Sequence, residues 1–123
     1  MIKLKTLVAA IVIALPVYAN AATNWTSADT ARELAFDAAS LVDLGQTHYI
    51  GDNPQHWQEL NPVLGSHPSS AKINEYFVGE MAGHYLISYL LPEEYRSYWQ
   101  TGTLVLELGV VGRNYNLGIG IRY

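Results

Sequence analysis

The sequence contains no cysteine among its 123 residues, so no disulfide can stabilise it. Small exported domains often depend on disulfides, because they cannot build a large hydrophobic core. The fold must therefore be held together by its core, by a partner, by a metal ion or by a membrane. The length suits one domain rather than two.

Basic residues are also scarce: the chain has 7 Lys and Arg against 11 Asp and Glu. Proteins that bind nucleic acid carry a basic face, so this balance argues against a nucleic-acid partner. The sequence also lacks a glycine-rich phosphate loop and a Gly-x-Ser-x-Gly nucleophile motif. We therefore expect no nucleic-acid partner, and the sequence leans against an enzyme.

The first 21 residues have the pattern of a secretory signal peptide. Lys3 and Lys5 precede an apolar run over residues 7–17, and Ala19 and Ala21 are the small residues that a signal peptidase reads. We expect cleavage after Ala21, which leaves residues 22–123 as one exported domain in the inner membrane or the periplasm. An uncleaved N-terminal anchor is the alternative, and Pro16 argues against it.

Three helices are predicted for the exported part. Thr26 and Asp29 have the spacing of a capping box, and this first helix should cover about residues 27–49. A serine cap and Pro92 delimit a second helix over about 70–91, and Pro92 also begins a third over about 93–114. Residues 115–123 alternate apolar with small or polar side chains, which predicts a short extended tail. The expected fold is an all-α three-helix bundle, with the second and third helices forming an antiparallel hairpin.

The connection over residues 51–68 is rich in Pro and Gly. Within it, Asn61, Pro62 and Gly65 predict an ordered turn, because Pro fixes one dihedral angle and Gly permits a positive one. We expect the apolar side chains of this loop to dock against the helices.

Narrow polar stripes follow the predicted helices. From Tyr76 to Leu91 of the second helix the only strongly polar side chains are Glu80, His84 and Ser88, which are spaced by four and so share one face. In membrane bundles such stripes face one another while apolar sides face lipid. A bundle in water carries a broader polar face instead. We favour embedding of the second and third helices in a membrane, although both apolar runs are shorter than the roughly 20 residues of a usual span.

The central site hypothesis is one buried polar cluster between helices, made of Glu80, His84 and Glu107 and reached by Asp43. An unpaired charge between apolar neighbours is costly, so these groups should pair. The structural interpretation is that the cluster fixes which helix faces meet. The minority interpretation is a metal ion at Glu80, His84 and Glu107, since positions four apart on a helix can share an ion.

The order of single residues over about residues 37–123 resembles small uncharacterised exported or membrane proteins of proteobacteria and their phages. The residues that carry the resemblance are Asp43, Asn61 to Gly65, His84, Leu91 with Pro92, Arg96, Gln100, Glu107 and Asn114. The resemblance implies a helical protein of the inner membrane or periplasm, and it implies no catalytic role.

Three functions are therefore weighed. We favour a non-enzymatic accessory protein of the cell envelope, with membrane lipid and other envelope proteins as partners. The alternatives are a metal-binding protein or enzyme using the Glu/His cluster, and a soluble periplasmic binding module.

Overall fold

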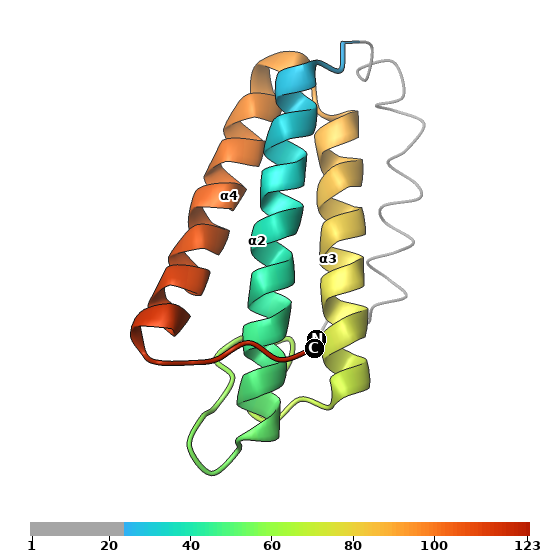
Figure 1. The fold of residues 1–123 in the computed structure, drawn as a ribbon. Helices are drawn as coiled ribbons and strands as arrows, with labels where there is room; N and C mark the ends of the chain where they lie inside the picture. Colours follow the sequence, from blue (N-terminus) through green and yellow to red (C-terminus); the bar gives the residue numbers. More distant parts are fainter. Residues whose placement is uncertain (1–23) are drawn as a thin grey trace.

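The computed structural model describes residues 24–123, so the expected signal peptide lies outside the described residues. The described part forms three helices: α2 (Ser27–Asp52), α3 (Ser70–Leu90) and α4 (Glu93–Asn116). Figure 1 shows α2 between the other two, with α3 antiparallel to both α2 and α4. The expected all-helical bundle of three helices is confirmed.

The helix ends follow from local chemistry. Thr26 caps α2: its side chain accepts from the Asp29 N–H, and the Asp29 side chain accepts from the Thr26 N–H, which completes the predicted capping box. The Ser69 side chain accepts from the Lys72 N–H at the start of α3. Pro92 precedes α4, where acidic residues in the first turn and Arg113 in the last suit the helix dipole.

The loop between α2 and α3 contains the predicted turn. The Asn61 carbonyl accepts from the Leu64 and Gly65 N–H groups, and Gly65 has a φ of 78°. Leu64 is buried against Ile73 and Phe77 of α3. Leu60 and Val63 of the same loop are exposed, so the expected docking of its apolar side chains holds for Leu64 but not for these two.

The C-terminal tail folds back along α2. Gly118, with a φ of 80°, ends α4 in a reversal in which the Ile119 N–H donates to the Asn114 carbonyl. The tail then crosses α2 (Figure 1), where the Arg122 N–H donates to the Gly45 carbonyl. A Cβ at Gly45 would lie 2.5 Å from Ile121, so glycine permits this close approach.

Polar side chains fill much of the bundle interior. Fully buried apolar residues are few and include Phe36, Ile73 and Phe77, whereas Arg96, Gln100 and Ser88 are completely inaccessible. Many large apolar side chains of α3 and α4 are instead exposed. The polar stripes therefore face inward, and hydrogen bonding, rather than apolar burial alone, decides how the helices meet.

Two details differ from expectation. α3 and α4 are antiparallel, but each packs mainly against α2 and they contact each other much less. Within residues 24–123, none of the helices has the length and apolar character needed to cross a bilayer. The expectation that the second and third helices are embedded in a membrane is therefore not supported by the helices of the described residues.

Candidate functional site

A buried hydrogen-bond network joins the three helices around Glu33 of α2. Its Oε1 lies 2.7 Å from His84 Nδ1, and its Oε2 accepts from Ser88 Oγ and Gln100 Nε2 at 3.0 Å each. Glu33 is 5% exposed, so three polar side chains from α3 and α4 satisfy a carboxylate that has left water.

His84 is held on both sides and at both nitrogens. Its ring stacks 3.6 Å from Phe36 and 5.3 Å from Trp99, measured between centroids. Nε2 lies 2.7 Å from Thr103 Oγ1, which itself donates to the Trp99 carbonyl. Both ring nitrogens are therefore engaged by protein side chains. No ring nitrogen is left free for a ligand.

Arg96 closes the end of the bundle near the α3–α4 connection. It is completely buried, and its guanidinium donates to the carbonyls of Ser88, Leu91 and Asn24 and to Asp29 Oδ2. Burial alone would raise the pKa of Asp29, but hydrogen bonds from Thr26, Arg96 and Arg32 lower it below its ordinary value. Four of the five N–H donors of the guanidinium are taken by protein acceptors, so this arrangement is a structural clamp.

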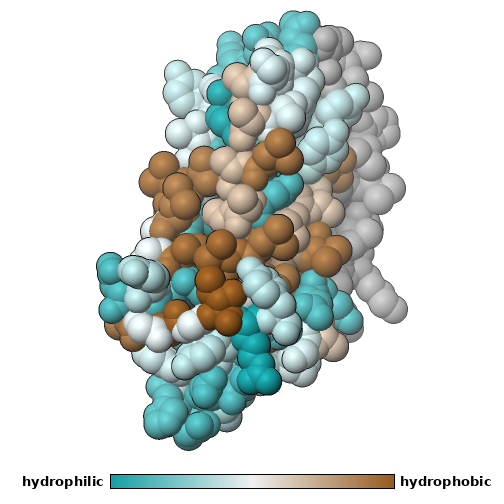
Figure 2. All heavy atoms as spheres, in the orientation of Figure 1, coloured by the Kyte–Doolittle hydropathy of each residue, from teal (hydrophilic) through white to brown (hydrophobic). Residues whose placement is uncertain are grey.

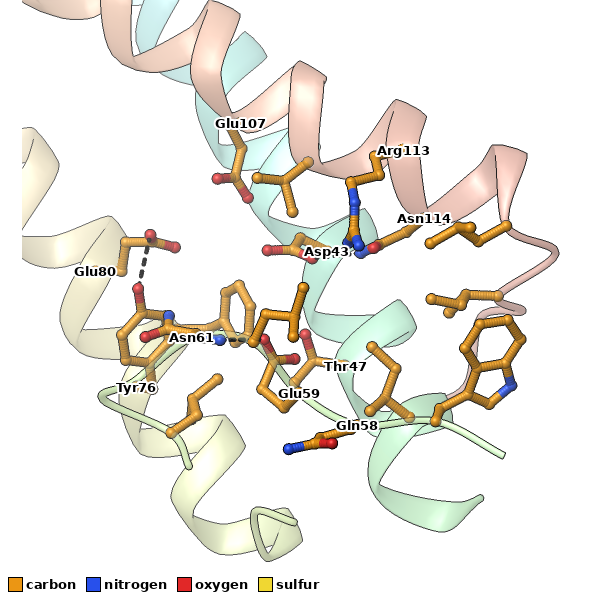
Figure 3. Close-up of a pocket in the computed structure, with 18 residues that line it drawn as sticks. Asp43, Thr47, Gln58, Glu59, Asn61, Tyr76, Glu80, Glu107, Arg113 and Asn114 are labelled. Atoms are coloured by element: carbon orange, nitrogen blue, oxygen red, sulfur yellow. Dashed lines mark hydrogen bonds between the residues drawn. The ribbon is translucent and has the colours of Figure 1, made fainter. Parts of the chain in front are cut away.

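A cavity of about 560 Å³ lies at the other end of the bundle, between the C-terminal halves of α2 and α4 and the N-terminal half of α3. Figure 3 shows its acidic residues: Asp43 from α2, Glu80 from α3, Glu107 from α4 and Glu59 from the loop. Apolar side chains line the remaining wall, among them Leu64, Phe77, Val110, Leu117 and Ile119. The cavity has the size of an ordinary small-molecule site.

The carboxyl groups of the cavity hold protons unusually tightly. Burial, followed by the negative charges of Glu59 and Glu80, raises the pKa of Asp43 to about 7. Burial, followed by Asp43 and Glu80, raises the pKa of Glu107 to about 8. Burial also raises the pKa of Glu80. Like charges that cannot all ionise together produce this pattern.

Two carboxyl oxygens in this cavity have no hydrogen-bond partner. Glu107 is 9% exposed and its Oε1 is unpartnered, as is Oε2 of Glu80. The other Glu80 oxygen accepts from Tyr76 Oη at 3.4 Å. Figure 3 shows Glu107 pointing into the space that Asp43 and Glu80 also face. The Asp43 and Glu107 side chains also lie within hydrogen-bonding reach of each other, so a proton shared between them satisfies the pair in the empty cavity, and a ligand that supplies charged donors would replace that proton.

The structure divides the four residues that the sequence grouped together. Asp43, Glu80 and Glu107 line one cavity, while His84 belongs to the separate Glu33 network. The turn residue Asn61 lies at the rim of the cavity, and Leu64 beside it forms part of the wall. The loop therefore shapes the site.

Sequence reasoning missed Glu33, the centre of the network, and Asp29 as the partner of Arg96. Both lie in the more polar first half of α2, where several charged residues stand close together and the sequence does not show which of them are buried. A signal was available: Asp29, Glu33 and Ser40 are spaced by four and seven, so they share one face. That face is the one α2 buries.

No cluster of three or more His, Asp or Glu side chains positioned for a metal ion occurs within residues 24–123. A scan of protein-family models found no match to this chain, and searches of curated proteins and of solved structures found no significant one. The geometry of the site is therefore the basis for any functional proposal.

Proposed function

We propose that this chain is a non-enzymatic binding protein of the cell envelope, and that its acidic cavity receives a small organic cation. The observation that carries the proposal is the Glu107 carboxyl group, which is buried, lacks a partner at Oε1 and faces a cavity shared with other carboxyl groups. A cationic N–H donor would satisfy these acceptors and offset their mutual repulsion.

The lining defines the chemistry of the ligand. Four carboxyl groups face one arginine, Arg113, so the ionised cavity is strongly negative. The apolar part of the wall favours a ligand with an apolar body behind its charged head. Thr47 and Tyr76 are the hydroxyl groups of the lining, and Tyr76 donates to Glu80.

The envelope location rests on the N-terminal sequence pattern. Lys3, Lys5 and the Ala19–Ala21 segment support export, as does the resemblance to small exported proteins. We propose that the chain acts as an accessory to other envelope proteins, by delivering or sensing the ligand it holds.

The test compares a cation with its neutral analogue. We expect 4-phenylbutylamine to bind at least about ten-fold more tightly than 4-phenylbutanol, because only the amine supplies a charged donor to the cavity. Affinity should strengthen from pH 6 to pH 9, since Asp43 and Glu107 ionise over that interval while the amine stays protonated. Titration calorimetry on residues 22–123 measures both effects.

Glu107→Gln is the informative variant, because it removes the ionisable group and keeps the shape. It should weaken amine binding by about ten-fold and leave the weak binding of the alcohol unchanged. Glu75→Gln, at an exposed position of α3 outside the cavity, is the matched control and should bind like the unmodified chain. Equal affinity for amine and alcohol, or no effect of Glu107→Gln, would overturn the proposal.

A further inference from the structure

The outward face of α4 carries a regular stripe of residues, most of them exposed. The stripe consists of Tyr95, Tyr98, Gly102, Val105, Gly109 and Gly112, at alternating intervals of three and four. Tyr98 is 79% exposed and Val105 is 62% exposed. A Cβ placed on any of the three glycines would have no atom within 4 Å. Alternating three- and four-residue spacing is the pattern of a helix seam that packs against another helix.

The stripe is complementary to itself when a second α4 runs antiparallel to it. If the two-fold axis lies midway between Gly102 and Val105, these two positions face each other across it. The same symmetry places Tyr98 opposite Gly109 of the other copy and Tyr95 opposite Gly112. Each large ring of the N-terminal half therefore meets a position without a side chain in the C-terminal half. Large residues packed against small ones allow two helices to approach closely.

The charges of α4 fit the same arrangement. From Ser97 to Gly112 the only charged residue is Glu107, which points into the cavity on the opposite side of the helix. Acidic Glu93 and Glu94 lie at the beginning of α4, and Arg113 lies near its end. Arg113 points into the cavity, so the acidic ends decide the orientation: parallel pairing would place Glu93 and Glu94 of the two copies side by side, whereas antiparallel pairing keeps them at opposite ends.

We infer that α4 is the interface of a two-fold symmetric homodimer, formed by antiparallel packing of the stripe from Tyr95 to Gly112. Around the stripe, Leu106 and Leu108 are 73% and 52% exposed, so pairing also covers apolar side chains that face water in a single chain. Figure 2 shows apolar residues gathered across the middle of the molecule and hydrophilic residues at its ends. The inference is independent of the cavity, which opens on the other side of α4.

Cysteine cross-linking tests the geometry directly, on a chain that has no cysteine of its own. In the double variant Tyr98→Cys/Gly109→Cys, each new cysteine faces the other type in the partner, so oxidised glutathione should produce a covalent dimer. Either single variant should stay monomeric on a reducing-agent-free gel. Its two cysteines would lie about 16 Å apart in the pair, from the rise of a helix, which is too far for a disulfide. Efficient cross-linking of Tyr98→Cys alone, or none in the double variant, would overturn the inference.

A charge placed at the two-fold axis gives a second readout. Val105→Glu brings two carboxylates together and should raise the dimer dissociation constant by at least about ten-fold in sedimentation equilibrium. Val78→Glu is the matched control, since Val78 is 63% exposed on α3, outside the stripe, and should leave the dimer unchanged. A chain that is monomeric in water and binds uncharged lipid vesicles through Val105 would show that lipid covers the stripe, which contradicts the inference.

Discussion

Arg96→Met is expected to lower the free energy of unfolding by about 3–5 kcal/mol, the largest effect that we predict for a single substitution. The side chain is completely buried and donates to three backbone carbonyls as well as to Asp29. Methionine fills much of the same space but supplies no donor. Asp29, which is 3% exposed, would keep its charge with one fewer partner, and the carbonyl groups would stay buried and unsatisfied.

Urea unfolding of Arg96→Met beside Arg122→Met measures this effect. Arg122 also pairs with an aspartate, Asp52, but both side chains are well exposed. Exposed ion pairs contribute little, so Arg122→Met should cost less than about 1 kcal/mol. Equal losses in the two variants would mean that Arg96 does not organise the end of the bundle as its contacts indicate.

Glu33→Gln is expected to cost about 2–4 kcal/mol, because Glu33 is the acceptor on which three helices converge. The carboxylate serves His84, Ser88 and Gln100 at once. An amide offers one oxygen where the carboxylate offers two, and if its NH₂ group took the place of Oε2 it would face the NH₂ group of Gln100. The resulting conflict lies in the interior, where water cannot relieve it.

Thermal and urea unfolding measure the loss, and Glu75→Gln on the exposed part of α3 serves as the control for the same chemical change. The network predicts a loss in Glu33→Gln alone. It also predicts that Ser88→Ala lowers the free energy of unfolding less in the Glu33→Gln background than in the unmodified chain, because the charged hydrogen bond between Ser88 and Glu33 is already lost. Additive losses would show that Glu33 and Ser88 act separately.

The helices could be predicted from the sequence because their ends are set locally. Each helix begins at residues that interact with neighbours only a few positions away: Thr26 with Asp29, Ser69 with Lys72, and Pro92 followed by acidic residues. No distant contact is needed to recognise these starts. The inward direction of the polar residues in α3 and α4 also followed from their spacing. These features depend only on helix periodicity and capping.

The pairing of the polar residues could not be predicted in the same way. His84 and Glu80 share a face of α3, yet one turn of helix separates the Glu33 network from the cavity. Which group meets which partner depends on how far each helix is displaced along α2. That displacement is set by the Arg96 clamp at one end and by the packing of Leu64 and the C-terminal tail at the other. Counting residues from the α3–α4 connection places a side chain along the bundle only to within about one turn of helix, which cannot separate Glu80 from His84.

The central claim is that the cavity exchanges protons for a bound cation, and calorimetry can count those protons. With pKa values of about 7 for Asp43 and about 8 for Glu107, the pair carries about one proton at pH 7.5. Binding of 4-phenylbutylamine at that pH, measured in buffers of different ionisation enthalpy, should release up to about one proton per site. Glu107→Gln should release much less. A cation that binds with no proton release, or with proton uptake, would contradict the assignment of the cavity as its site.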